Sequence, residues 1–215
     1  GLGLLFYGMG AMGAAMALAG AAITAAVVRR DPPARDDALD RAIDRTLLRY
    51  LGAPRGDRIY LTAKLHSDPV VQQLARLEPP LGEVLDVACG RGQLSILLVE
   101  LGLATRFTGL DWDRRKVEVC QVAAGEDGRA IVADATRAEL APADTVLIID
   151  ALHYLAREER RALLERAAAA LRPGGRLVIR ELDPKRGLRS RIAQWAERVG
   201  SRVGMNRGAV CEWVD

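Results

Sequence analysis

The sequence predicts an α/β fold: a doubly wound, mainly parallel sheet with helices on both faces, preceded by an apolar helix. Three observations predict it. From Glu83 onward, short apolar runs alternate with helical patterns, which is typical of buried parallel strands joined by helices. A glycine-bearing turn follows the first of these runs. No charged residue occurs between positions 2 and 28, which predicts a membrane-spanning helix.

Length and charge limit the organisation of the chain. Its 215 residues leave room for one ordinary domain after the apolar segment. We divide it into an apolar segment (1–30), a linker with amino-terminal helices (31–82) and an α/β domain (83–215). The net charge is +3, but the arginines are interspersed with acids, which argues against a nucleic-acid partner. No cysteine or histidine spacing indicates a metal site.

The apolar segment favours a membrane anchor. As a helix, residues 2–28 would be roughly 40 Å long, which is enough to cross a bilayer. Arg29 and Arg30 follow directly, and positive residues flanking a span favour the cytoplasmic side. We therefore expect the rest of the chain to lie at the cytoplasmic face of a membrane, or in the cytoplasm if the segment is not a span.

Two other interpretations of this segment stay open. A secretory signal peptide would carry basic residues before its apolar run, and none precede this one. Residues 8–13 match GxGxxG, and the surrounding YGMGAMGAAMA resembles the opening of a hydroxyacid dehydrogenase. A dinucleotide fold needs a full helix after that motif and a second strand ending in an acid, whereas the helix available before Ile23 is short.

Helix-breaking prolines and the periodicity of apolar residues predict the elements between the apolar segment and the domain. Residues 31–33, Asp-Pro-Pro, end the apolar helix because proline lacks a donor. Apolar spacing predicts an amphipathic helix over 34–51 and a second helical region over 60–77. Residues 78–82 form a stiff, proline-rich approach to the domain.

Five apolar runs predict the strands of the sheet. They cover residues 84–87, 106–110, 130–133, 145–149 and 176–180. Helices are predicted between them over 94–101, 114–124 and 157–171. Pro173-Gly174-Gly175 is expected to close the last helix and turn the chain into the fifth strand. Because no further strand pattern follows and the chain begins with Gly1, we expect a piece of a longer protein.

The turn after the first strand carries the sharpest chemical signal. It reads DVACGRG from Asp86 to Gly92. Gly90 and Gly92 let a ligand lie against bare backbone, and the start of the following helix attracts an anionic group. The turn therefore predicts a ligand that bears such a group.

The next three strands each end in an acid. Asp111 comes nineteen positions after Gly92, where a carboxylate is placed to accept ribose hydroxyls. Asp134 can accept from an adenine amino group, and Asp150 ends the fourth strand. Taken singly, each acid is more often a helix cap or a solvated charge. In register on successive strand ends, they predict a nucleoside site.

The segments DVACGRG, GLDWD, ADAT, LIIDALHYL and LRPGGRLVIRE, in this order, resemble the class I S-adenosylmethionine-dependent methyltransferases. The resemblance implies S-adenosylmethionine as cofactor and S-adenosylhomocysteine as product. It also implies that the first turn surrounds the methionine part, Asp111 holds the ribose and Trp112 packs on the adenine. The cofactor-binding residues so implied are Asp86, Ala88, Cys89, Gly90, Gly92, Asp111, Trp112, Asp134, Ala135 and Asp150. The family usually has glycine where Ala88 stands.

Methyl transfer proceeds mainly by alignment of donor and acceptor, so a general base is optional. If the acceptor loses a proton, His153 is the best-placed base, with Tyr154 and Glu181 as lesser candidates; an equally good interpretation of His153 is a packed helix-start residue. Cys89 is expected to pack in the turn rather than act as a nucleophile. Lys64, from the amino-terminal helices, is placed to approach the cofactor carboxylate.

The sequence therefore predicts a methyltransferase that acts on a small, hydrophobic or membrane-associated acceptor. The expected tether motivates that substrate class. The alternative is a non-catalytic cofactor-binding or scaffold module fused to a membrane protein. The sequence does not predict an oligomeric state.

Overall fold

The computed structural model describes residues 37–181. Its centre is a sheet of five strands in the order β3-β2-β1-β4-β5, and all neighbouring pairs are parallel. The strands are β1 (Gly82–Val87), β2 (Ala104–Asp111), β3 (Gly128–Val132), β4 (Ala143–Ile149) and β5 (Leu171–Arg180). The strand order reverses between β1 and β4, and open α/β sheets bind ligands beyond the carboxyl ends of strands at such a switch point.

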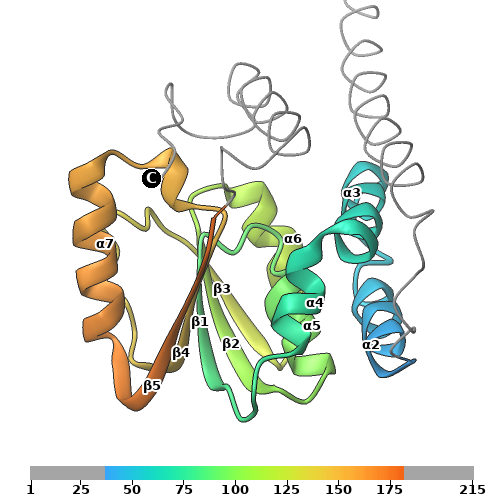
Figure 1. The fold of residues 1–215 in the computed structure, drawn as a ribbon. Coiled ribbons are helices and arrows are strands. Elements are labelled where there is room, and N and C mark those ends of the chain that lie inside the picture. Colours follow the sequence, from blue (N-terminus) through green and yellow to red (C-terminus); the bar gives the residue numbers. More distant parts are fainter. Residues whose placement is uncertain (1–36, 182–215) are drawn as a thin grey trace, which may run out of the picture.

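Helices cover both faces of the sheet, as Figure 1 shows. On one face lie α5 (Gln93–Glu100) and α6 (Arg114–Ala124), and on the other lies α7 (Arg157–Ala169). Val84 of β1 belongs to the core on the α5 side, and the next residue, Leu85, belongs to the core on the α7 side. Alternate residues of a strand point to opposite faces, so a strand covered on both faces is apolar at most of its positions. The predicted doubly wound, mainly parallel fold is confirmed.

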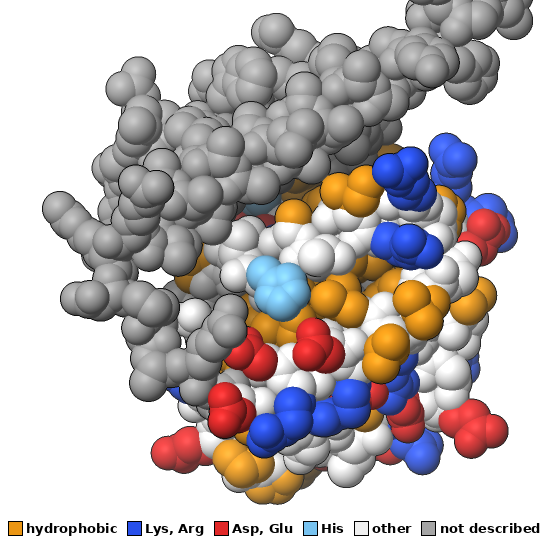
Figure 2. Space-filling view, turned by 90° about the vertical axis from the view of Figure 1, so that its right-hand side faces the viewer, with side chains coloured by type: hydrophobic (Ala, Val, Ile, Leu, Met, Phe, Trp, Pro, Cys, Tyr) orange, Lys and Arg blue, Asp and Glu red, His pale blue; other side chains and the backbone are white. Residues whose placement is uncertain are grey.

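Three further helices form a layer beside α5: α2 (Asp37–Leu48), α3 (Arg55–Ser67) and α4 (Pro69–Ala75). Figure 2 shows this side of the molecule, where basic, acidic and apolar side chains are interspersed. The large apolar side chains exposed on α2, on α3 and between them are Leu48, Leu51, Ile59 and Tyr60.

The helical region predicted over 60–77 is present, but it begins at Arg55 and ends at Ala75. The structure has two helices that meet at Asp68, which ends α3 and caps α4. The Asp68 Oδ1 accepts a hydrogen bond from the Val70 backbone N–H at 2.9 Å. Pro69 disfavours a helical conformation at the residue before it, and a capping aspartate in that place starts a new helix. The sequence carried this signal in Asp68-Pro69.

The end of the last predicted helix is also wrong. The helix ends at Ala169, and Leu171 already pairs with Ala143 as the first residue of β5. The expected connection, residues 173–175, forms an irregularity inside β5 before pairing resumes at Arg176. Gly174 has a φ of 78°, which glycine adopts without strain. The helix predicted over 34–51 ends at Leu48.

The predicted membrane segment and the glycine motif at 8–13 lie outside the described residues. Over residues 37–181, the structure contains no helix with the length and hydropathy needed to cross a membrane.

Candidate functional site

The turn between β1 and α5 depends on an unusual backbone. Ala88, Gly90 and Gly92 have φ values of 63°, 58° and 74°, a region that L-residues other than glycine occupy at a cost. The space that a Cβ would take at Gly90 is open. A ligand can therefore approach the bare backbone at Gly90, whereas Ala88 holds the same type of conformation under strain.

Two thiols pack beneath this turn. A Cβ at Gly92 would lie 2.3 Å from the Sγ of Cys120, and a Cβ at Gly109 would lie 2.6 Å from the Sγ of Cys89. Both cysteines are buried. The two glycines thus make room for the sulfur atoms, and the packing leaves Cys89 away from solvent.

Asp111 joins the turn after β1 to the turn after β2. Its Oδ2 accepts the Gly90 backbone N–H at 2.8 Å, and its Oδ1 accepts the Asp113 backbone N–H at 2.9 Å. Each carboxylate oxygen has a second lone pair, so the buried side chain can also accept hydrogen bonds from the hydroxyl groups of a ligand. Trp112 follows and is 41% exposed, which offers an aromatic surface next to this carboxylate.

Asp86 supports the turn from inside the protein. Its side chain is buried, and its Oδ2 accepts the Ser95 hydroxyl at 2.6 Å. Burial, with a smaller effect of the nearby Asp111 charge, raises its pKa to about 6 against the opposing Ser95 hydrogen bond. The buried Gln93 Oε1 has no hydrogen-bond partner within the described part of the chain. This orphaned acceptor and the open backbone at Gly90 fit a polar ligand in the turn.

The end of β3 is fixed by local hydrogen bonds. The Asp134 Oδ1 accepts the backbone N–H and the hydroxyl of Thr136 at 3.0 and 2.7 Å. The Ala135 carbonyl accepts from the Arg166 guanidinium of α7 at 2.6 Å. Asp134 and Ala135 therefore lie at the predicted strand end, and their contact with an adenine edge stays a prediction.

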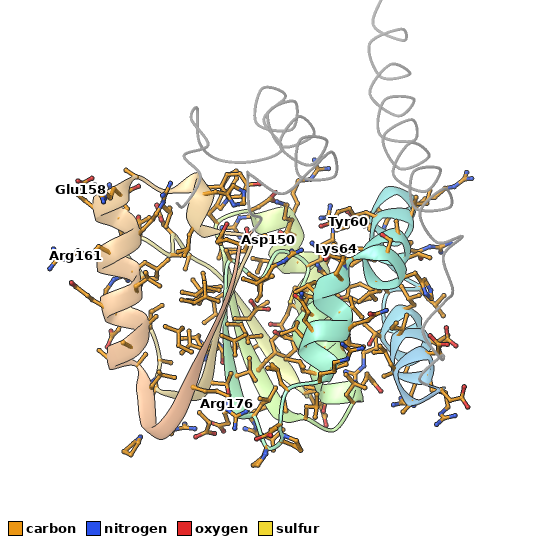
Figure 3. All side chains as sticks on the ribbon, in the orientation of Figure 1. Tyr60, Lys64, Asp150, Glu158, Arg161 and Arg176 are labelled. Atoms are coloured by element: carbon orange, nitrogen blue, oxygen red, sulfur yellow. The ribbon has the colours of Figure 1, made fainter. Side chains whose placement is uncertain are left out.

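Asp150 lies at the end of β4 in a cluster of charged side chains. It contacts Arg180 of β5, and its Oδ2 lies 3.5 Å from the Lys64 Nζ. The same ammonium lies 2.6 Å from the Asp68 Oδ2. Figure 3 shows Lys64 and Asp150 at the carboxyl ends of the strands. The contacts that fix both residues are to charged groups of the chain itself, and their predicted roles toward the cofactor stay predictions.

His153 lies in a short 3₁₀ helix, Leu152–Tyr154, that follows β4. Its side chain is buried, and its Nδ1 lies 2.7 Å from the Glu181 Oε2. The other oxygen of Glu181 accepts the backbone N–H groups of Ala151 and Leu152 at 2.9 and 2.6 Å. Glu181 thus holds both the imidazole and the backbone before it.

Sequence reasoning named Glu181 as a lesser proton acceptor and missed its contact with His153. The two residues are separated by 28 positions. Only the parallel pairing of β4 with β5 brings the two strand ends together, so no local pattern could have shown the contact.

Comparisons with known proteins find similarity to methyltransferases. Residues 84–175 match the family model of a methyltransferase domain. The chain is 30% identical over 115 residues to the ubiquinone biosynthesis O-methyltransferase of Xanthomonas axonopodis pv. citri (strain 306), a match that covers 51% of this chain and 46% of that protein. It is 32% identical over 133 residues to O-methyltransferase cnsE of Penicillium expansum, which covers 56% and 46%. The chain thus spans about half the length of these curated relatives.

A solved structure, the "DhpI-SAM-HEP complex", shares the fold with a TM-score of 0.50 and 20% sequence identity. The similarity covers 75% of this chain and 73% of that one.

Proposed function

We propose that this chain, whose residues 84–175 match the model of a methyltransferase domain, transfers the methyl group of S-adenosylmethionine to an oxygen atom of a small molecule. The cofactor is S-adenosylmethionine, which the domain match and the shared class I fold support. The choice of oxygen as the acceptor atom rests on the two curated relatives, which are both O-methyltransferases.

One observation carries the proposal. Asp111 bonds the Gly90 N–H of the glycine turn at 2.8 Å, so the acid expected to bind ribose and the turn expected to enclose the methionine part form one connected unit. The glycine turn of this unit follows β1 and adjoins the switch point between β1 and β4, where α/β folds bind nucleotides. Residues Asp86 to Gly92 would hold the methionine part, and Asp111 the ribose.

The cofactor supplies a methyl group that is activated by a sulfonium sulfur. The chain supplies alignment and exclusion of water. For a hydroxyl acceptor we propose His153 as the base. When its Nδ1–H donates to Glu181, the Nε2 is the basic nitrogen. It would take the acceptor's proton as the oxygen bonds to the methyl carbon and the bond from that carbon to the sulfonium sulfur breaks, which would leave S-adenosylhomocysteine.

We further propose an apolar acceptor that is reached at the cytoplasmic face of a membrane. The uncharged segment 2–28 motivates this location, and the relative named for ubiquinone biosynthesis supports an apolar acceptor. Membrane extracts that yield methylated products, while soluble metabolites do not, would support it. Efficient methylation of soluble metabolites alone would contradict it.

The cofactor site is tested by titration calorimetry of the full chain with S-adenosylmethionine. Asp111→Ala should weaken binding by roughly 1.5 to 3 kcal/mol, because a charged hydrogen-bond acceptor is lost. Glu158→Ala, which removes an exposed carboxylate of α7, should bind as the parent does. Circular dichroism checks that each variant is folded.

Each outcome bears on the proposal. A folded parent that binds no S-adenosylmethionine contradicts the cofactor site. Equal affinities of the parent and Asp111→Ala contradict the role of Asp111. Tight cofactor binding without any methylated product from membrane or soluble extracts would favour the non-catalytic module.

A further inference from the structure

One face of α3 carries a row of polar side chains. Asp57, Tyr60 and Lys64 recur at spacings of three and four residues, and Asp68, the residue that caps the helix, continues the row. Residues three and four apart lie on the same side of a helix. All four side chains contact residues at or just beyond the carboxyl ends of β1, β4 and β5.

The first half of α3 is fixed to the glycine turn. The Asp57 Oδ1 lies 2.5 Å from a guanidinium nitrogen of Arg91, and the Tyr60 ring centroid lies 4.7 Å from the same guanidinium. Tyr50, just before α3, donates its hydroxyl to the Arg91 carbonyl at 2.7 Å. Because Arg91 stands between the two glycines of the turn, these contacts connect α3 directly to the cofactor-binding backbone.

The second half of α3 is fixed to β4 and β5. Lys64 contacts Asp68 and Asp150, and Arg180 contacts the same two acids. The four side chains are only 14–21% exposed, so solvent screens these pairs less than pairs on an open surface. Burial by itself lowers the pKa of Lys64. The opposing effects of Tyr60, Asp68 and Asp150 together are larger, so the pKa is raised above its ordinary value and the ammonium stays charged.

Asp150 depends on this support. It has a φ of 53°, a left-handed conformation that aspartate adopts less readily than glycine. Its Oδ1 is buried and has no hydrogen-bond partner within residues 37–181. Burial raises the pKa of this carboxyl despite the neighbouring Lys64 and Arg180. A strained, partly desolvated carboxylate keeps such a position only when its surroundings hold it there.

We propose that Lys64 is a positioning residue for cofactor binding, because it ties Asp150 at the end of β4 to the helix that also holds the glycine turn after β1. Helix α3 thereby braces the two sides of the switch point. Figure 3 shows Tyr60 and Lys64 on α3 and Asp150 at the strand ends. The inference rests on the proposed function of this site and names a residue that acts on it through Asp150.

The test uses titration calorimetry of the full chain with S-adenosylhomocysteine as the probe. Lys64→Met keeps the length of the side chain and removes its charge, and it should weaken binding about tenfold in a protein that stays folded. Lys64→Arg should restore the affinity. Arg55→Met, which removes an exposed cation from the same helix, should leave it unchanged.

A double-mutant cycle tests the route through Asp150. If Lys64 acts by holding this carboxylate, Asp150→Asn and Lys64→Met should each weaken binding, and the double variant should bind no more weakly than the poorer single variant. If the losses of affinity in the two single variants add fully in the double variant, Lys64 does not act through Asp150. A merely structural role would lower the denaturation midpoint of Lys64→Met and leave the affinity of the folded protein unchanged, which would overturn the proposal.

Failure of the proposed function gives a different result. If the folded parent does not bind S-adenosylhomocysteine, the cofactor assignment fails, and amide hydrogen exchange then tests the brace. Lys64→Met should speed exchange both in α3 and in the glycine turn, since both are held through this helix. Unchanged exchange in the glycine turn would overturn the role of Lys64.

Discussion

Ala88 adopts a backbone conformation that glycine would adopt at lower cost. Its φ is 63°. The methyltransferases that this chain resembles usually have glycine at this position. A Cβ in this region crowds the neighbouring carbonyl oxygen. The turn persists because the hydrogen bond from Gly90 to Asp111 and the packing around Cys120 hold it.

Ala88→Gly should therefore stabilise the protein by roughly 0.5–1 kcal/mol, because relief of the left-handed strain outweighs the extra chain entropy of glycine. Urea denaturation measures the change. Ala162→Gly, an exposed position within α7, is the control and should destabilise by about 1 kcal/mol. Equal losses in both variants would show that Ala88 carries no strain.

Asp86 gives the stability of the protein a pH dependence. Its pKa rises from 3.8 in the unfolded chain to about 6 in the fold. A carboxyl whose pKa is raised by folding contributes stability below the unfolded value, and this contribution is lost as the pH rises through the folded value. Asp86→Asn removes the titrating group, so the stability of this variant should not fall in that pH range. The amide oxygen of the new side chain can still accept the hydrogen bond from the Ser95 hydroxyl.

We expect the free energy of unfolding of Asp86→Asn, relative to the parent, to rise by up to about 3 kcal/mol between pH 4 and pH 7. Urea denaturation at several pH values in that range measures the difference. Parallel curves for the two proteins would show that Asp86 titrates normally in the fold.

At the scale of elements, Glu100 holds α2 against the end of α5. Its two oxygens lie 2.6 Å from the Arg49 guanidinium and 2.7 Å from that of Arg45. The Glu100 side chain is 12% exposed. One largely buried carboxylate therefore orients two arginines of the amino-terminal layer.

Glu100→Gln should lower the free energy of unfolding by roughly 1–3 kcal/mol, because two guanidinium groups lose a partly buried charged partner. Denaturation with urea measures this loss. The control is Glu165→Gln, which breaks an exposed pair with Arg161 on α7 and should change stability little, since water already screens that pair. Similar losses in the two variants would contradict the importance of burial.

The elements themselves were largely predictable. The five strands lie where apolar runs predicted them, and the helix over Arg114–Ala124 has the predicted bounds. The break at Asp68, which was not predicted, and the misplaced helix end before Pro173 both involve proline. In each case the local breaker was visible, but whether it starts a new helix or distorts a strand depends on what the following residues pack against.

At the scale of the whole molecule, the amino-terminal helices contact the candidate site. Tyr50 and Asp57 contact Arg91, while Lys64 contacts Asp150. These contacts join α3 to both sides of the point where the strand order reverses. Our proposal that α3 braces the site rests on these contacts.

The sequence by itself determined the parallel α/β fold, the glycine turn and the acids at the strand ends. These features depend on periodicity and turn chemistry within a few residues of each other. Only the tertiary structure decided that Glu181 holds His153, that Asp111 bonds the turn at Gly90 and that Lys64 supports Asp150. Such partners lie far apart along the chain, and they meet only because the packed sheet brings its strand ends together.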